Sequence, residues 1–242
     1  MSALQERPIS LTKQMRGYRE RCVTFNELRD DEWTIYGSEI ESYDEDFYGA
    51  LEGITISQFI QRRFSPTVID LMSPSDTLAD LFTKTSHIQK TGIAVSLKDK
   101  RDESQKERDS RLGITQIEGD LTRNATWKMI QETLGDKKAD LIIERGAGAI
   151  SLFPQNERLF AILLSKMWDL LSKNNGTMLL DALAPKHVFS NPSIEPLRWV
   201  RELSYYRIPN NFGYSADLPD HVFVKIVKTP NSPKELPKPY TR

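Results

Sequence analysis

The stretch 67–82 constrains the fold more than any other part of the chain. It opens with an apolar run that suits a strand buried on both faces, breaks at Pro74, and resumes with apolar residues at helical spacing. Ser75 or Asp76 is predicted to cap the helix. A strand that runs into a helix points unpaired N–H groups at the crevice beyond the strand, where open α/β sheets bind ligands.

Apolar runs and helical patterns alternate along the rest of the chain. Strands are predicted over 92–97, 114–120, 139–144, 177–183 and 221–228, and helices over 55–63, 124–134, 155–173 and 193–206. Asn124 is expected to cap its helix and Gly135 to end it. The alternation predicts an α/β fold with a doubly wound, mostly parallel sheet and helices on both faces. The last strand, which has no helix after it, is expected to insert antiparallel near the sheet edge.

One main α/β domain with an addition at each end is expected. The 242 residues contain no Pro/Gly/Ser-rich linker in the middle of the chain, which favours a single domain over 55–228. Residues 1–54 are predicted to be a helical and acidic extension that packs on or caps this domain, either as a solvated arm or as a lid. Residues 229–242 form a Pro-rich tail, predicted to be disordered or extended.

The composition limits the compartment and the class of partner. The formal net charge is −1, from 33 basic and 34 acidic residues, so no global field draws the chain to nucleic acid or anionic lipid, although a local basic patch stays open. Cys22 is the single cysteine, and no apolar run approaches a membrane span. A cytoplasmic protein without membrane contact is expected. The three histidines lack companions at metal-ligand spacing, so no metal site is predicted.

Five segments between residues 55 and 228 together resemble the class I S-adenosylmethionine-dependent methyltransferase (Rossmann-like) fold. Val68–Leu71 is similar to that family's first strand, and Ile117–Asp120 is similar to the end of its third strand. Ala139–Ala147 is similar to the fourth strand and the loop after it. Lys173–Leu180 is similar to the helix end, turn and fifth strand, and His221–Lys228 is similar to the last strand. The resemblance implies S-adenosylmethionine as cofactor. It implies a cofactor-binding set at the strand ends, made of Asp70, Ser73, Ser75, Ser96, Asp120 and Glu144.

The implied roles have alternatives. Asp70 either orients the turn or reaches the cofactor's amino group, or else it caps neighbouring amides. Asp120 either contacts the adenine edge or is a turn acid after Gly119. Glu144 with Arg145 either handles a substrate proton or carboxylate or forms a surface ion pair.

The chain departs from the family at the turn after the first strand. The three positions that the family fills with glycine correspond to Met72, Pro74 and Asp76, a degenerate form of its glycine-rich motif. The acid that ends the family's second strand corresponds to Ser96, and Asp99 substitutes for it only if that strand ends late.

The resemblance implies methyl transfer to an unknown acceptor, mostly by positioning the reactants, so no catalytic side chain is assigned. The alternative is a non-catalytic binding or scaffolding protein of the same fold that has lost the cofactor. A third reading is an enzyme that uses the crevice for a different nucleotide. The partner is therefore either an unknown methyl acceptor or a protein. An RNA-facing patch over 98–111 is the minority reading of a stretch that otherwise suits a solvated helix or loop.

Overall fold

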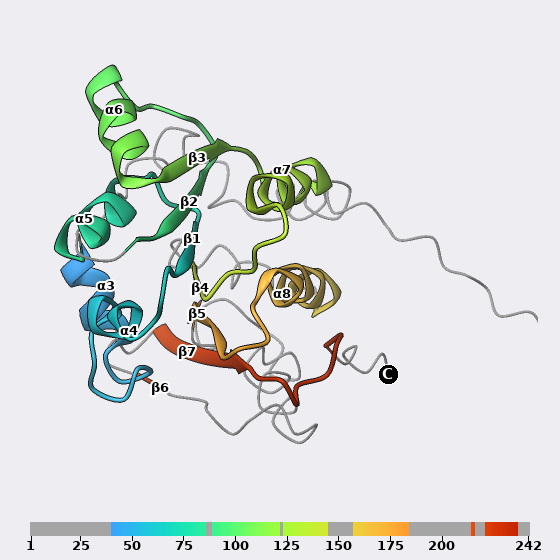
Figure 1. The fold of residues 1–242 in the computed structure, drawn as a ribbon. Coiled ribbons are helices and arrows are strands. Elements are labelled where there is room, and N and C mark those ends of the chain that lie inside the picture. The colour runs from blue at the N-terminus through green and yellow to red at the C-terminus, as the bar shows by residue number, and fades with distance from the viewer. Residues whose placement is uncertain are drawn as a thin grey trace, which may run out of the picture.

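A single twisted sheet organises the computed structural model, which describes residues 40–85, 89–121, 123–144, 157–183, 214–215 and 221–236. The described strands lie in the order β3-β2-β1-β4-β5-β7-β6. Their bounds are β1 Thr67–Leu71, β2 Thr91–Ser96, β3 Ile114–Glu118, β4 Leu141–Glu144, β5 Gly176–Leu183, β6 Tyr214–Ser215 and β7 His221–Lys228. Figure 1 shows the strands stacked in this order through the centre of the molecule.

The pairing confirms a mostly parallel, doubly wound sheet. Strand β1 pairs in parallel with β2 and β4, β2 with β3, and β4 with β5. Strand β7 runs antiparallel between β5 and β6, as the absence of a following helix predicted. Every residue of β1 and β4 is buried, which explains why their sequences are apolar rather than alternating.

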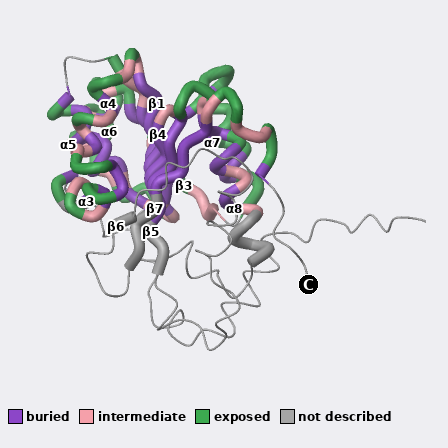
Figure 2. The backbone as a smooth tube through the Cα atoms, turned by 90° about the horizontal axis from the view of Figure 1, so that it is seen from below, coloured by how far each residue is buried: buried purple, intermediate pink, exposed green. Residues whose placement is uncertain are grey.

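Helices cover both faces of the sheet. The described helices are α3 Ile40–Phe47, α4 Ile56–Gln61, α5 Asp76–Lys84, α6 Glu103–Leu112, α7 Asn124–Leu134 and α8 Glu157–Leu170. Helices α3, α4 and α5 share one apolar cluster with one face of the strands, and α7 and α8 share a second cluster with the other face. In Figure 1 helices α3 to α6 lie to one side of the strands and α7 and α8 to the other, and Figure 2 shows the buried strands between them.

Local capping fixes where the helices begin and end. Thr55 and Asp102 each form a capping box, with Gln58 and Gln105 respectively, at the starts of α4 and α6. The prediction that Asn124 caps its helix is wrong: Asn124 is the first residue of α7, and Arg123 occupies the cap position without a side-chain bond. Helix α7 does end at Gly135, as expected, where φ is +57°.

The acidic segment before α4 packs into the core through its aromatic residues. Tyr43 and Phe47 are almost fully buried on α3. Asp44, also on α3, accepts a hydrogen bond at 2.5 Å from the backbone N–H of Ile56, the first residue of α4. Lys84 at the end of α5 bonds Glu41 and lies 3.0 Å from Asp80. Residues 40–54 are thus joined to the sheet by apolar burial and by polar contacts.

The Pro-rich segment, expected to be disordered or extended, packs against the folded domain over residues 230–236. Trp168 of α8 donates its indole N–H to the carbonyl of Pro233 at 3.2 Å. Leu236 is only 6% exposed and belongs to the apolar cluster under α7 and α8. The chain therefore closes over α8 after β7 ends.

Several expectations lie outside the described residues. They are the N-terminal helical pattern before residue 40, the helix predicted over 193–206, and the loop from Arg145 to Ala149 after β4. Among the helices that the structure does describe, none combines the length and apolar character that crossing a membrane requires.

Candidate functional site

The carboxyl ends of three neighbouring strands meet at one edge of the sheet. Leu71, the last residue of β1, pairs in register with Val95 of β2 on one side and with Glu144 of β4 on the other. The chain then turns through 72–75 into α5. A crevice of this kind, beyond the carboxyl ends of parallel strands, is where doubly wound sheets bind ligands.

Met72 gives the turn after β1 the backbone conformation of a glycine. Its φ is +70°, in the left-handed region that costs a residue with a side chain about 1–2 kcal/mol. The next N–H, that of Ser73, donates to the carbonyl of Val95 at 3.0 Å and so continues the pairing of β1 with β2. Met72 packs partly buried against the cluster under α7 and α8. Met72, at the position that corresponds to the family's first glycine, therefore has a backbone conformation that favours glycine.

Ser73 and Ser75 are both buried in this turn. The Ser73 hydroxyl donates to the Pro74 carbonyl at 3.1 Å and lies 3.4 Å from the Thr77 hydroxyl. Ser75 occupies the cap position of α5, as predicted, but its side chain makes no capping bond. Among the described residues the Ser75 Oγ has no hydrogen-bond partner, although Ser75 is fully buried. Buried hydroxyls normally have a partner, so the Ser75 hydroxyl is an exception among the described side chains.

Asp70 and Glu144, predicted for one site, lie on opposite faces of the sheet. Asp70 pairs with Ile143, whose side chain belongs to the cluster beneath α3, α4 and α5. Glu144 is one residue further on and therefore points to the α7 and α8 side, because successive strand residues alternate between faces. Both are fully buried.

Ser96 ends β2, and its hydroxyl is already engaged within the protein. It donates to the carbonyl of Lys98 at 2.8 Å and accepts from the side-chain amide of Gln116 at 2.9 Å. Gln116, on β3, was not singled out from the sequence, because a single amide in a strand of mixed pattern gives no signal of its own. Since β2 ends at Ser96, the condition under which Asp99 would take the place of the strand-end acid is not met.

Asp99 instead belongs to an ion-pair network that fastens α6. Arg101 binds Asp99 through two nitrogens, at 2.9 and 2.8 Å, and reaches Asp109 at 2.9 Å. Arg108 bonds the other oxygen of Asp109 at 2.8 Å and Asp76 at 2.9 Å. The hydrogen bonds from Arg101 hold the pKa of Asp99 below its ordinary value.

This network continues to the turn at the crevice. Asp76 is the first residue of α5 and stands at the last of the three glycine positions. The Asp109 carboxylate at its centre is fully buried. The side chain at that glycine position therefore ties α5 to α6.

Asp120 lies in a tightly held loop between β3 and α7. Its carbonyl accepts bonds from the Thr126 hydroxyl at 2.7 Å and from the Arg123 N–H at 2.9 Å. Its carboxylate is 21% exposed and lies 3.7 Å from the Arg123 guanidinium. Gly119 beside it has no room for a Cβ, which would stand 2.6 Å from the Thr126 side chain. Asp120 is therefore fixed at the carboxyl edge of β3.

No group of His, Cys, Asp or Glu side chains within the described ranges has the arrangement of a metal site. Of the predicted site residues, Ser73, Ser75, Ser96 and Asp120 gather at the carboxyl ends of β1, β2 and β3 and in the loops that follow. Asp70 and Glu144 lie beneath that edge, on its two faces.

Comparison with solved structures identifies the architecture. The chain superposes on the CurJ carbon methyltransferase with a TM-score of 0.51 at 10% identity, covering 91% of this chain and 65% of that one. The chain has the class I methyltransferase fold. The strand order with its antiparallel β7 agrees with this likeness.

Two weaker matches have TM-scores below 0.5 and add no weight. One is TrmN from Thermus thermophilus, with a TM-score of 0.43 at 18% identity over 76% of this chain and 53% of that one. The other is a 1,6-didemethyltoxoflavin-N1-methyltransferase from Burkholderia thailandensis, with a TM-score of 0.41 at 12% identity over 95% of this chain and 93% of that one. No protein-family model and no curated protein match the sequence.

The residues at the crevice can be compared with three parts of S-adenosylmethionine, which are its amino-acid end, its adenine and its ribose. They suit the first two parts and not the third. The left-handed turn at Met72 and the buried, unbonded Ser75 hydroxyl suit the amino-acid end of the cofactor. Asp120, fixed and partly exposed, suits a hydrogen bond to the adenine edge. At the end of β2, where ribose hydroxyls would need an acceptor, Ser96 and Asp99 are both bonded within the protein.

Proposed function

We propose that this protein binds S-adenosylmethionine at the carboxyl edge of β1, β2 and β3 and transfers its methyl group to an acceptor that is not yet identified. The observation that carries the proposal is the φ of +70° at Met72. A residue with a side chain keeps a glycine conformation only where the surrounding structure requires it. The turn that brings α5 to the crevice is thus retained at an energetic cost, which argues for a retained ligand.

In this proposal the protein acts mainly by holding the reactants in line, which needs few catalytic side chains. Ser75 would donate to the cofactor's carboxylate, and Asp120 would accept from the adenine amino group. Asp70 and Glu144 would shape the pocket floor from the two faces of the sheet. The cofactor-binding set we propose is Asp70, Ser73, Ser75, Asp120 and Glu144, without Ser96, whose hydroxyl is bonded to Lys98 and Gln116. We also infer a cytoplasmic location, because a chain with only Cys22 forms no internal disulfide and suits a reducing compartment.

A second candidate is a non-catalytic binding subunit of the same fold. The bonds of Asp99 to Arg101 and of Ser96 to Gln116 favour it, because they use the groups nearest to the expected ribose position. A crevice closed in this way would serve as a rigid support for a protein partner. The two candidates differ in one property, the affinity for the cofactor.

Calorimetric titration and thermal unfolding with S-adenosylmethionine and S-adenosylhomocysteine separate them. If the dissociation constant is near 10 μM, about 1 mM ligand stabilises the fold by about 2.7 kcal/mol and raises the melting temperature by about 5–10 °C. No shift and no heat with either ligand would rule out the methyltransferase and leave the binding subunit.

Two variants locate the binding. Asp120→Ala should weaken the calorimetric affinity at least ten-fold, since the adenine edge loses a charge-assisted bond worth about 1.5–3 kcal/mol. Asp136→Ala is the matched control, because Asp136 is an exposed acid that lies before β4, at the opposite edge of the sheet. Equal affinities for the two variants would remove Asp120 from the site.

A further inference from the structure

The edge of the sheet opposite the crevice collects the amino ends of the parallel strands. Thr67 at the start of β1 pairs with Thr91 of β2, and Val68 pairs with Leu141 of β4. Leu141 in turn pairs with Thr177 of β5. Because β7 is antiparallel, its last residue reaches the same edge. With a spacing of about 4.8 Å between strands, the edge from β2 to β7 is about 19 Å wide.

The loops at this edge carry an excess of positive charge. We call this set the basic edge. Its exposed members are Arg62, Lys137, Lys138 and Lys173, and its partly buried members are Arg63 and Lys90. Lys228, at the end of β7, is buried and is not counted among them. The acids in the same loops and at the end of α8 are fewer and are Asp136, Asp140 and Asp169. One of these, Asp140, is committed to the backbone N–H of Thr67 at 2.9 Å. The chain as a whole has a net charge of −1, so this positive charge is local.

Hydrogen bonds join the loops that carry the basic edge to one another and to the end of α8. Arg63 donates to the carbonyl of Asn175 at 2.7 Å, which joins the loop before β1 to the loop before β5. Lys138 and Lys228 donate to neighbouring carbonyls at the end of α8, at 2.8 and 2.6 Å. Burial lowers the pKa of Lys228, the negative charge of Asp169 opposes this, and the charges of Lys138 and Lys173 lower it further. Lys138 and Lys173 therefore lie within electrostatic range of Lys228.

An aromatic side chain stands in solvent beside these charges. Phe64 is 98% exposed, the most exposed of the large apolar residues that the structure describes. The next residue, Ser65, has a φ of +48°, a left-handed conformation that marks a tight, strained turn at the tip of this loop. Arg63 stacks on Phe59 at 4.3 Å on the other side of the loop. Phe64 is therefore presented outward by a loop that is fixed at its base.

We propose that the basic edge, with Phe64, binds single-stranded nucleic acid. A phosphodiester chain matches a row of lysines and arginines, and an unpaired base offers a flat face for stacking on an exposed aromatic ring. An acidic protein segment would match the charges and leave Phe64 without a role. Because the basic edge lies away from the crevice, the proposal does not depend on cofactor binding.

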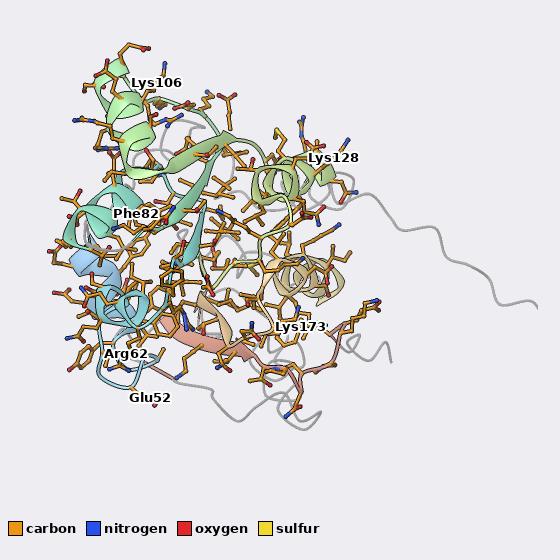
Figure 3. The ribbon with its side chains drawn as sticks, viewed as in Figure 1. Glu52, Arg62, Phe82, Lys106, Lys128 and Lys173 are labelled. Carbon is orange, nitrogen blue, oxygen red and sulfur yellow. The ribbon has the colours of Figure 1, made fainter. Side chains whose placement is uncertain are left out.

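The test is fluorescence anisotropy of the full chain with a labelled single strand of about 12 nucleotides, as RNA and as DNA, each titrated with salt. The double variant Arg62→Gln/Lys173→Gln removes two exposed charges of the basic edge. Its matched control is Lys106→Gln/Lys128→Gln, which removes two exposed charges on α6 and α7. Figure 3 shows Arg62 and Lys173 in the lower half of the view and Lys106 and Lys128 in the upper half.

We expect the wild type to bind the single strand. In the basic-edge variant, the slope of log affinity against log salt concentration should be smaller in magnitude by about 1.4, because two phosphate contacts are lost. At low salt this corresponds to a loss of affinity of more than about ten-fold. Phe64→Ala should weaken binding at least about five-fold at every salt concentration, since stacking is not ionic. The control variant should bind as the wild type does.

Four results would overturn the proposal. The first two are no binding by the wild type and an equal loss in the basic-edge and control variants. The third is polyglutamate binding that matches or exceeds the single strand, which would assign the surface to an acidic protein. The fourth is a duplex of equal charge that binds as tightly, with Phe64→Ala binding as the wild type does.

Discussion

Arg101 and Asp99 form a bidentate pair just beyond the end of β2, with Nε 2.9 Å from Oδ1 and Nη2 2.8 Å from Oδ2. The remaining guanidinium nitrogen of Arg101 reaches Asp109 at 2.9 Å. Arg101 thus binds Asp99, the acid closest in sequence to the end of β2 where the ribose is expected. It also anchors α6. Helix α6 has little apolar surface of its own, and Asp109 is its only fully buried residue. Ionic contacts take the place of apolar packing in its attachment.

Replacing Arg101 with Ala should therefore destabilise the protein. We expect a loss of about 2–3 kcal/mol in the free energy of unfolding, below the cost of a buried charge left with no partner, because Arg108 still bonds Asp109. Urea denaturation followed by circular dichroism measures this. Lys106→Ala on the same helix removes an exposed pair with Glu103 and should leave the unfolding free energy nearly unchanged. Equal losses for the two variants would contradict the anchoring role.

Because the pKa of Asp99 is lowered, the contribution of this network to the free energy of unfolding should decrease at low pH. The bonds from Arg101 lower the pKa of Asp99, so its contribution to stability is complete above the ordinary value of 3.8 and is lost as the pH falls through the lower folded value. The difference in unfolding free energy between the wild type and Asp99→Asn should be constant near neutral pH and should shrink below pH 3.8. Urea denaturation at a series of pH values tests this. A difference that grows toward low pH would have the wrong sign and would contradict the role of Asp99.

Asp44 offers an opposite case, because burial raises its pKa while its side chain accepts the N–H of Ile56. Asp44→Asn keeps an oxygen acceptor and removes the buried charge, so its stability at neutral pH should be equal to that of the wild type or higher. Asp44→Ala leaves the first N–H of α4 without this partner and should cost about 1–2 kcal/mol. Thermal unfolding of the two variants decides the matter. A loss in Asp44→Asn as large as in Asp44→Ala would show that the charge itself is required.

The backbone and the side chain of Met72 have opposite effects on stability, because its positive φ is strained while its side chain packs against apolar residues. Met72→Gly relieves the left-handed conformation and loses apolar packing, so the unfolding free energy should change by less than about 1 kcal/mol. Met72→Val keeps an apolar side chain but is branched at Cβ, and it should be less stable than the glycine variant by at least about 1 kcal/mol. If the cofactor binds in the crevice, calorimetry should show equal or tighter binding to Met72→Gly. Equal stabilities for the two variants would mean that the turn does not require a positive φ.

The sequence predicted the sheet well where strands are buried on both faces. The bounds of β7 were predicted to the residue, and β1 begins where the apolar run of the stretch 67–82 begins, because both runs are bordered by turn-forming residues. Strand β6 was missed because two residues are too few for any periodic pattern. The start of β4 was predicted two residues early, since Ala139 is apolar and makes only an isolated bridge to Leu171. Whether a segment is a strand follows from its own residues, whereas the residue at which the strand begins or ends depends on the strands that pair with it.

The site was less predictable because its contacts are long-range. The position of Asp70 and Glu144 at strand ends could be read from the sequence, but their opposite faces follow from the register of β1 against β4. The partner of Ser96, Gln116, is 20 residues away on another strand. The buried Asp109 lies in a stretch of alternating charge that otherwise indicates a solvated helix. A buried polar side chain leaves no periodic pattern in the sequence. Its burial can be recognised only from the folded structure, where its hydrogen-bond partners are known.

The position of β7 has a consequence for synthesis. This strand is the last in chain order, yet it lies between β5 and β6. On the ribosome, the parallel strands can assemble once residue 183 has emerged, while one edge of β5 stays open until residues 221–228 follow. An open strand edge is a template for pairing with another chain. Nascent chains halted before His221 are therefore the ones in which we expect chain-to-chain association.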